Sequence, residues 1–246
     1  MNAGSVDDVA VRFDNCTVVV TGVGREGQVG DAVAREFAKR GAAVAIIHHD
    51  ITLVEERAAA LRAEGLDVRP YACDLTDRNA TDAVAQRIAQ GSDGRISALA
   101  NIAGGFAMSG PISESDPSVL ERQLAINLGS AYGATRALLP ALRSARGAIV
   151  YMAAAAILPG RKMSGMSAYV AAKSAVVALM RCVAQEEIGT GVRANALAPT
   201  AIRTKTNLGA LGSKVPYIER ESIAAIIAFL CSPAAANVNG QVIELT

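Results

Sequence analysis

The sequence has almost no net charge and no long apolar run. Its 246 residues include 24 basic and 23 acidic side chains, which leaves a formal charge of +1. Proteins that bind nucleic acid or an anionic membrane surface usually carry a clear basic excess. The chain lacks that excess, so we expect no nucleic-acid partner and no membrane partner.

Signals for membrane insertion and export are also missing. An uninterrupted apolar run of about eighteen residues would indicate a membrane-spanning helix, and the chain has none. The first fourteen residues are polar and include Asp7 and Asp8, where a secretory signal would have a basic start and an apolar centre. We therefore expect a cytoplasmic protein.

Cysteine and histidine are too few and too scattered for a metal site. The four cysteines form no C-x-x-C pair, and the only histidines are His48 and His49, so no metal-ligand spacing occurs. We interpret the cysteines as small buried apolar side chains in a reducing cytoplasm rather than as disulfides. They are Cys16, Cys73, Cys182 and Cys231.

Apolar residues make up 51% of the chain, enough to bury the core of a sizeable α/β domain. The β-branched run 16–21 predicts a strand buried on both faces. A glycine-rich turn from Gly22 to Gly30 follows, then a helical stripe up to Gly41 and a second strand at 43–47. In this order of elements, backbone N–H groups and a helix N-terminus can hold a pyrophosphate.

Strand and helix alternate along the rest of the chain. The pattern predicts helices at 51–63, 76–89, 119–142 with interruptions near Gly129 and Gly133, 167–189 and 218–230, and strands at 68–72, 96–100, 147–152, 192–196 and 241–245. No linker or repeat interrupts it. We predict one doubly wound Rossmann-type α/β domain over residues 1–246, with a central parallel sheet and helices on both faces.

Two segments fall outside this alternation. Residues 1–14 form an N-terminal extension. Residues 200–216 show no clear periodicity and follow the carboxyl end of a strand, where ligands bind in such sheets. We interpret them as a mobile substrate loop, with a plain surface loop as the alternative.

One pair of side chains has the spacing of an acid/base unit. Tyr169 and Lys173 are four residues apart, so on a helix they share one face. A nearby ammonium favours the phenolate and lowers a tyrosine pKa of about 10, which makes the pair a candidate general acid/base. The alternative is a half-buried tyrosine beside a solvated lysine.

Several motifs in order resemble the short-chain dehydrogenase/reductase family, over about residues 16–245. They are the turn beginning Thr21-Gly22, Asp74 after the third strand, Asn101-Ile102-Ala103-Gly104 after the fourth, Asn127 on the long helix, Tyr169 with Lys173, and Asn195 to Pro199 followed by Ile202 and Thr204. Each motif is weak alone. Together they make an unrelated Rossmann-like domain a poor alternative.

The resemblance implies an NAD(P)-dependent oxidoreductase that moves hydride between a nicotinamide cofactor and a carbonyl or alcohol. Tyr169 would exchange the proton, Lys173 would lower its pKa and bind the nicotinamide ribose, and Asn127 would hold a water that connects Lys173 to solvent. The cofactor-binding residues it implies are Gly22, Gly24, Arg25, Gly27, Val29, Gly30, His48, His49, Asp74, Leu75, Asn101, Ala103, Gly104, Tyr169, Lys173, Pro199, Ile202 and Thr204.

The chain departs from the family at its catalytic serine. Counting from the fifth strand places that position at Ala154, and counting back from Tyr169 places it at Ala156. Either residue lacks a hydroxyl, and loss of such a donor weakens catalysis. Ser164 or Ser167 could replace it, but we favour a role for them at the helix start.

The glycine turn departs as well. From Thr21 to Gly30 it is two residues longer than the family pattern, and Gln28 stands where the middle glycine would be. Gly24 and Gly27 could rebuild the phosphate cradle, or the extra residues could weaken cofactor binding. Thr200 also replaces the glycine usual after Pro199.

Cofactor preference is indicated by the end of the second strand. His48 stands where an acidic residue would favour NAD, and Arg25 could meet a 2′-phosphate, so NADP(H) is favoured over NAD(H). Alternatively, both histidines and Arg25 are merely exposed.

The substrate is expected to be a small, apolar carbonyl or alcohol, because residues 106–112 and 200–216 are apolar or weakly polar. Two other functions stay open: a catalytically impaired dinucleotide-binding or regulatory protein, and a non-redox enzyme of the same fold. Apolar helices are expected at 120–142 and 170–183, and the family that the chain resembles usually forms dimers or tetramers through the corresponding helices. We therefore predict a homodimer or homotetramer.

Overall fold

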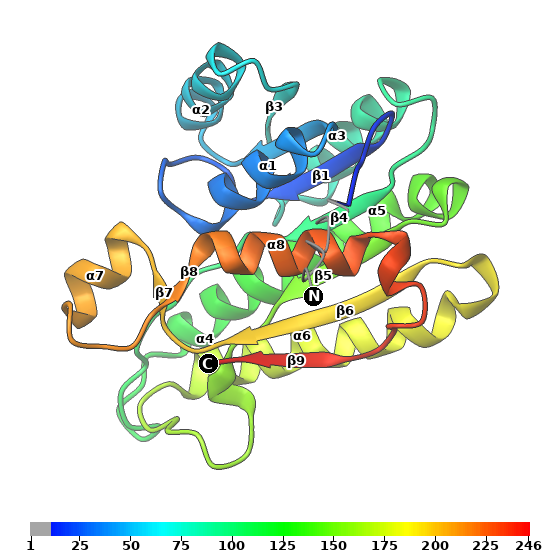
Figure 1. Ribbon diagram of the computed structural model, residues 1–246. Coiled ribbons are helices and arrows are strands. Elements are labelled where there is room, and N and C mark those ends of the chain that lie inside the picture. Colours follow the sequence, from blue (N-terminus) through cyan, green and yellow to red (C-terminus); the bar gives the residue numbers. More distant parts are fainter. Residues whose placement is uncertain (1–10) are drawn as a thin grey trace, which may run out of the picture.

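The computed structural model describes residues 11–246, so most of the N-terminal extension and its Asp7 and Asp8 lie outside the described residues. Seven parallel strands form one sheet in the order β3-β2-β1-β4-β5-β6-β9 (Figure 1). The strands are β1 (Thr17–Thr21), β2 (Ala43–His48), β3 (Val68–Ala72), β4 (Ala98–Asn101), β5 (Ala148–Met152), β6 (Arg193–Pro199) and β9 (Val242–Leu245).

Helices connect these strands and cover both faces of the sheet. They are α1 (Val29–Lys39), α2 (Ile51–Ala63), α3 (Arg78–Gln90), α4 (Pro117–Gln123), α5 (Ser130–Ala145), α6 (Ser167–Glu186), α7 (Lys205–Leu211) and α8 (Arg220–Cys231). The doubly wound Rossmann-type fold predicted from the alternating pattern is confirmed.

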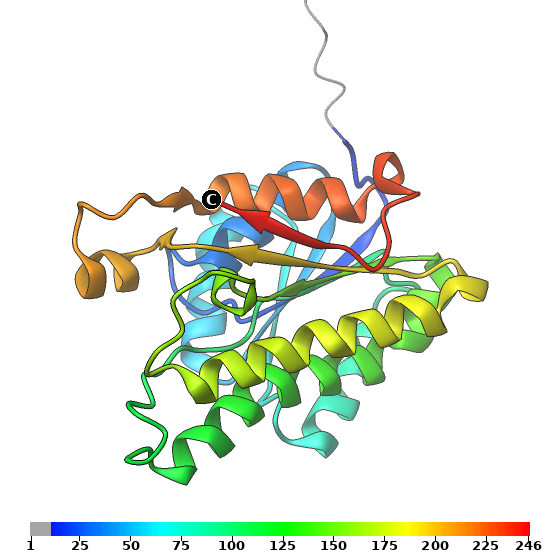
Figure 2. The same cartoon turned by 90° about the horizontal axis from the view of Figure 1, so that it is seen from below.

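The sheet separates two apolar cores, which Figure 2 shows as helical layers above and below the strands. Val18 and Val20 of β1 face the core formed with α1, α2 and α8, and Val19 between them faces the core formed with α3, α5 and α6. Successive side chains of a strand point to opposite faces, so a run of buried β-branched residues fits a strand covered on both sides.

The strand order reverses between β1 and β4, and a threonine joins their carboxyl ends. The Thr21 hydroxyl accepts hydrogen bonds from the backbone N–H groups of Ile102 and Ala103, each at 3.0 Å. A Cβ on Gly22 would lie 2.9 Å from the Cα of Ala103, so only glycine fits this close approach. Ligands of open α/β sheets bind at this kind of reversal point.

Several local expectations are corrected. The interruption expected near Gly129 in the helix at 119–142 is confirmed, as the π-helical segment Leu124–Gly129 between α4 and α5, whereas Gly133 lies inside α5 and does not interrupt it. Residues 200–216 hold the short strand β7 (Ile202–Arg203), which pairs with β8 (Ile218–Glu219), and the helix α7, although no periodicity indicated them. Local hydrogen bonds, not an apolar stripe, form these elements: the Tyr217 hydroxyl donates to the carbonyls of Asn207 and Gly212.

The cysteines and the longest helix also need correction. Cys73 and Cys231 are buried as expected, Cys16 is partly buried, and Cys182 is exposed on α6. By length and composition alone, α6 is apolar enough to cross a membrane. It packs against β5 and β6 in the core, and this packing explains its apolar composition.

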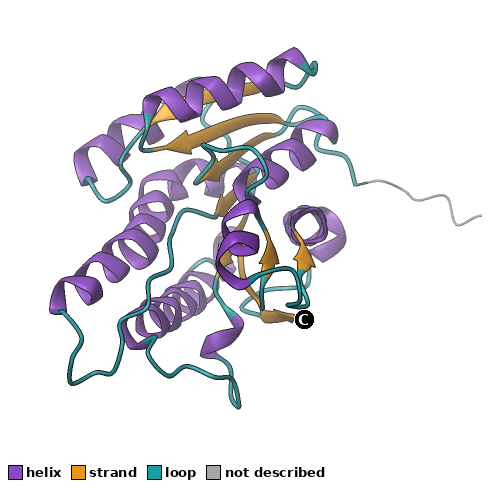
Figure 3. Cartoon of the chain, turned by 90° about the vertical axis from the view of Figure 1, so that its left-hand side faces the viewer, coloured by secondary structure: helices purple, strands orange, loops and turns teal. Residues whose placement is uncertain are grey.

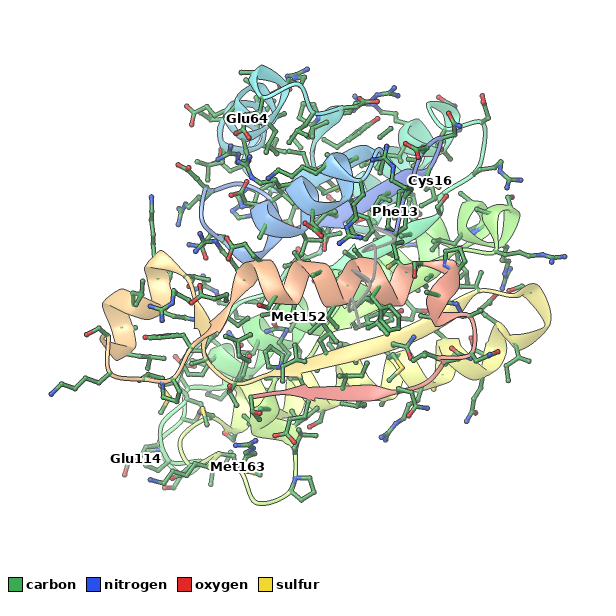
Figure 4. The ribbon with its side chains drawn as sticks, viewed as in Figure 1. Phe13, Cys16, Glu64, Glu114, Met152 and Met163 are labelled. Atoms are coloured by element: carbon green, nitrogen blue, oxygen red, sulfur yellow. The ribbon has the colours of Figure 1, made fainter. Side chains whose placement is uncertain are left out.

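The described end of the N-terminal extension belongs to the core, and its loss should be measurable. The Phe13 ring is 3% exposed and packs edge-on against Phe37 of α1, with ring centres 4.9 Å apart (Figure 4). Phe13→Ala should lower the free energy of unfolding by about 3 kcal/mol, because it leaves a cavity under α1. Urea denaturation measures this, with the exposed neighbour Arg12→Ala as control. Equal midpoints for Phe13→Ala and wild type would contradict the packing.

Candidate active site

A cavity of about 370 Å³ opens at the carboxyl ends of the central strands, which face the viewer in Figure 3. Its lining comes from residues at or just after the ends of β1, β2, β3 and β4, together with Arg122, Ile126 and Ser130 of the helical segments beyond β4. It brings together seven of the predicted cofactor-binding residues: Gly22, His48, His49, Asp74, Leu75, Ala103 and Gly104. The remaining predicted residues lie around it or beneath it.

The glycine turn beside this cavity has the features of a phosphate cradle. A Cβ on Gly30 would lie 2.5 Å from the carbonyl oxygen of Gly22, so the first turn of α1 must pass close to the strand end. The first backbone N–H of α1 to form a helical hydrogen bond is that of Ala32, which donates to the carbonyl of Gln28, the N-cap residue. The N–H groups before it are the unsatisfied donors of a helix N-terminus, and Val29 and Gly30 carry two of them. These residues fit the pyrophosphate of a dinucleotide.

His48 and Asp74 line the cavity side by side, because β2 and β3 end next to each other and the Cys73 N–H donates to the His48 carbonyl. Burial, followed by the neighbouring His49, lowers the pKa of His48 below its ordinary value, and its Nδ1 accepts the Asp50 N–H at 3.0 Å. His48 is therefore neutral near pH 7 and adds no positive charge. The N–H and hydroxyl of Thr76 hold the Asp74 carboxylate and lower its pKa, which keeps it ionised as an acceptor.

Tyr169 and Lys173 lie on one face of α6, as predicted. The Lys173 ammonium donates to the Met152 carbonyl at the end of β5, at 2.7 Å, and lies 6.0 Å from the centre of the Tyr169 ring. Burial lowers the pKa of Lys173 to about 8 and raises that of Tyr169 to about 12. The expected lowering of the tyrosine pKa by lysine is thus outweighed by burial in the unliganded site.

Asn127 lies in the π-helical segment and braces the loop that follows β4. Its amide nitrogen donates to the carbonyls of Gln123 and Gly105, each at 3.0 Å, and its oxygen accepts the Gly105 N–H at 3.2 Å. A Cβ on Gly104 would lie 2.5 Å from the Asn127 oxygen and 3.4 Å from the Lys173 nitrogen. Gly104 therefore lets Asn127 and Lys173 converge on the cavity wall.

Both residues expected at the serine position of the family, Ala154 and Ala156, are alanines. Ala154 is the second residue after the end of β5 and is 7% exposed. Among residues 11–246, the Tyr169 hydroxyl has no hydrogen-bond partner. Ser167 is the first residue of α6, as predicted, but Met166 takes the N-cap position. The Ser167 hydroxyl forms a hydrogen bond with that of Ser109 at 3.0 Å, and Ser164 is exposed.

Other predicted cofactor residues occupy positions near the cavity without lining it. Asn101 is buried and donates its amide to Thr135 of α5, tying the end of β4 to that helix. Pro199 ends β6, and Ile202 packs against the core below α8. The Thr204 hydroxyl caps α7 by accepting the Asn207 N–H at 3.1 Å. The outer part of the glycine turn, between β1 and α1, holds Gly24, Arg25 and Gly27.

Exposed apolar side chains surround the mouth of the site. Phe106 packs edge-on against the Tyr169 ring at 5.0 Å and is 57% exposed. Its loop is held to the loop before α6 by hydrogen bonds from Ser109 and Gly110 to the Gly165 carbonyl. Figure 4 shows Glu114 and Met163, from these two loops, in the same corner of the molecule. The exposed apolar residues of this region are Phe106, Met108, Ile112, Met163 and Leu211.

A buried ion pair beneath the glycine turn was not predictable from the sequence. Asp31 of α1 accepts the Gly27 N–H at 3.0 Å and faces Arg57 of α2, with 3.3 Å between Oδ1 and Nε. Both side chains are about 6% exposed. No motif relates these positions, because the contact depends on how α1 and α2 pack.

No group of three or more His, Cys, Asp or Glu side chains in residues 11–246 could hold a metal ion.

The chain resembles known proteins along nearly its whole length. The family described as short chain dehydrogenase matches residues 16–210. A Mycobacterium tuberculosis protein named (5R,7aS)-5-hydroxy-7a-methyl-1-oxo-2,3,5,6,7,7a-hexahydro-1H-indene-carboxyl-CoA reductase is 34% identical, over 95% of this chain and 93% of that protein. The meso-2,3-butanediol dehydrogenase of Serratia marcescens is 32% identical, over 94% and 92%.

Solved structures agree with these relatives. A short chain dehydrogenase from Mycobacterium smegmatis superposes with a TM-score of 0.83 at 31% identity, covering 95% of this chain and 92% of that one. A short-chain type dehydrogenase/reductase from Mycobacterium ulcerans gives a TM-score of 0.88 at 26% identity, covering 96% and 90%. The chain belongs to the short-chain dehydrogenase/reductase family and is an oxidoreductase.

The buried ammonium of Lys173 should make stability depend on pH. In the unfolded chain lysine keeps a pKa near ~10.4, so between pH ~8 and ~10 the unfolded state binds more protons and stability rises with pH. Lys173→Met should remove this rise and be more stable than wild type at pH 7, by roughly 1–3 kcal/mol. Urea unfolding across this pH range measures it, with the exposed Lys162→Met as control. Parallel curves for wild type and Lys173→Met would refute the buried charge.

Proposed function

We propose that this protein reduces a carbonyl, or oxidises the corresponding alcohol, with a nicotinamide cofactor and with Tyr169 as the acid/base. The observation that carries the proposal is the position of Lys173. Its ammonium, anchored on the end of β5, lies next to Gly104 of the cavity that the predicted cofactor-binding residues line. A buried cation at that place matches the role expected for the lysine of this family.

Each of the three polar residues would have a defined task. Tyr169 is protonated at neutral pH because burial raises its pKa to about 12, and this form donates a proton to a carbonyl oxygen. Lys173 would bind the nicotinamide ribose and stabilise the phenolate that remains. Asn127, held by Gln123 and Gly105, would position a water for proton exchange with Lys173. The cofactor, when bound, would supply or accept the hydride.

NADP(H) is the cofactor we favour. The end of β2 presents His48, which cannot bind the ribose hydroxyls as an acidic side chain would. Asp50, two residues on, uses its carboxylate to cap α2 by accepting the Leu53 N–H. Arg25 is exposed on the glycine turn and is the cation available to a 2′-phosphate at this end of the site.

The substrate is proposed to be apolar. Phe106 covers one edge of the Tyr169 ring, and Met108 and Met163 add flexible apolar surface at the mouth. The relatives are named for ketones and alcohols of different polarity. The proposal of an apolar substrate therefore rests on the apolar side chains at the mouth of the site and not on the family. We also expect a homodimer or homotetramer, since Leu120 of α4 and Tyr132 of α5 are exposed.

Cofactor binding and a tyrosine variant test this function. The purified protein should bind NADPH more tightly than NADH in a fluorescence titration. Tyr169→Phe should keep cofactor affinity and lose turnover of apolar ketones by about a hundredfold or more, because the proton donor is gone. Binding without turnover would favour a dinucleotide-binding or regulatory protein. Turnover without cofactor would indicate a non-redox enzyme.

The missing serine gives a second test. Ala154→Ser should raise kcat by about tenfold or more with little change in KM, because a hydroxyl there would stabilise charge that develops on the substrate oxygen. Ala156→Ser, two residues further along, is the comparison variant for the other position expected for the serine, and kcat should stay unchanged there if Ala154 is the position. A gain from Ala156→Ser alone would show that counting back from Tyr169 locates the position.

A further inference from the structure

The loop that follows β4 brings an aromatic ring into contact with the candidate acid/base. Phe106 packs edge-on against Tyr169, with the ring centres 5.0 Å apart and the ring planes at 86° to each other. Gly104 and Gly105, directly before Phe106, line the cavity that holds seven of the predicted cofactor-binding residues. The Phe106 ring therefore follows directly on the wall of that cavity, and it is exposed there.

The start of this loop is fixed by Asn127. The Asn127 amide nitrogen donates to the Gly105 carbonyl at 3.0 Å, and its oxygen accepts the Gly105 N–H at 3.2 Å. A Cβ on Gly105 would lie 2.9 Å from Cδ1 of Ile126, so the loop passes close against the π-helical segment. The residue immediately before Phe106 is thus held through both of its backbone polar groups.

The far side of the loop is fixed to the segment before α6. The N–H groups of Ser109 and Gly110 both donate to the Gly165 carbonyl, at 2.8 and 3.1 Å, and the hydroxyls of Ser109 and Ser167 form a hydrogen bond at 3.0 Å. A Cβ on Gly165 would lie 3.0 Å from Cε of Met108, so the two loops are in contact (Figure 2). Because α6 begins at Ser167, the loop and the acid/base pair share one support.

The two perpendicular rings form a corner of fixed shape. The backbone on both sides of Phe106 is held by hydrogen bonds, so the ring keeps its angle to Tyr169. Among residues 11–246, the Tyr169 hydroxyl has no hydrogen-bond partner, which leaves it available to a carbonyl oxygen. A substrate that reaches this hydroxyl therefore brings the group beside its carbonyl against the exposed Phe106 ring.

The corner favours a flat group in that place. In an aryl ketone or a conjugated enone, the carbonyl lies in one plane with the ring or double bond beside it. Such a group can lie against the phenyl ring while its oxygen points to the phenol. Two aromatic rings in contact gain more than the burial of apolar area alone, whereas a saturated ring is thicker and gains only the burial.

We propose that Phe106 is a specificity-determining residue that selects substrates with a flat aromatic or conjugated group next to the reacting carbonyl. The inference rests on the proposed function, because it narrows the apolar substrate of that reaction to an aryl ketone or an enone, or to the matching alcohol. Met108 and Met163, exposed at the same mouth, would contact the more distant part of the substrate, since methionine adapts to different shapes.

The test compares two methyl ketones with the same number of carbon atoms, reduced by the full chain with NADPH and with NADH. Acetophenone has a flat phenyl ring, and cyclohexyl methyl ketone has a saturated ring. Phe106→Leu keeps an apolar side chain and removes the aromatic face. It should lower the ratio of kcat/KM for acetophenone to that for cyclohexyl methyl ketone about twofold to tenfold, mainly through the KM of acetophenone.

Comparing this ratio between wild type and variant cancels the intrinsic reactivities of the two ketones. Phe106→Tyr keeps the aromatic face and should keep the wild-type ratio. The matched control is Ile112→Leu, an exposed apolar residue beyond the Gly165 contacts, which should also leave the ratio unchanged. If Phe106 only stabilised the loop, Phe106→Leu would lower the values for both ketones alike.

Two amides of the same shapes, benzamide and cyclohexanecarboxamide, give a second readout that needs no turnover. In NMR titrations with and without NADPH, wild type should prefer benzamide, and Phe106→Leu should lose that preference. Where wild type binds a cofactor but reduces neither ketone, this readout decides: a lost preference supports the role of Phe106, and equal affinities in wild type overturn it.

An unchanged kcat/KM ratio in Phe106→Leu would overturn the inference and leave the oxidoreductase function standing. An equal fall of the ratio in Ile112→Leu would overturn it as well, because any apolar side chain at the mouth would then serve. Folded wild-type protein that binds neither NADPH nor NADH would overturn the proposed function itself, and with it the assignment of a ketone substrate.

Discussion

The site depends on the junction of two strand ends. Thr21 closes β1, and its hydroxyl accepts two backbone N–H groups from the turn after β4, while Gly22 lets that turn approach to contact distance. The chain leaves β1 toward one edge of the sheet and leaves β4 toward the other. The glycine turn after β1 and the Asn101–Gly104 turn after β4 both start from this junction, whereas Tyr169 and Lys173 reach the site from α6.

The acid/base pair shows what burial does to such a site. The Lys173 ammonium lies 6.0 Å from the centre of the Tyr169 ring, too far to offset the desolvation of the phenolate. Burial therefore raises the pKa of Tyr169 and lowers the pKa of Lys173. The tyrosine is kept as a proton donor and the lysine as a group that loses its proton near pH 8. A bound ribose and substrate would replace the missing polar surroundings. In the unliganded pocket Tyr169 therefore stays protonated at neutral pH.

The sequence was sufficient to predict the fold and the convergence of seven candidate residues on one cavity, because both follow from local rules. Buried β-branched runs, helical stripes and glycines at strand ends predicted the sheet, and the 3.6-residue period placed Tyr169 and Lys173 on one face. Contacts between distant segments were not predictable: Asp31 with Arg57, Ser109 with Ser167, and Gln28 with Thr206. The short helix α7 was missed because two local hydrogen bonds define it: the Thr204 hydroxyl accepts the Asn207 N–H, and the Tyr217 hydroxyl donates to the Asn207 carbonyl. Cys182 proved exposed because it lies on the outer face of α6.

The chain differs from the expected family pattern at two places, and their surroundings differ. Alanines stand at both positions expected for the serine, Ala154 and Ala156. Gln28, at the place expected for the middle glycine, donates its side-chain amide to the Thr206 hydroxyl of α7 at 3.3 Å, and the N–H of the neighbouring Gly27 is held by Asp31 of α1. The lengthened turn is therefore tied to two separate helices, α1 and α7, although it lacks that glycine.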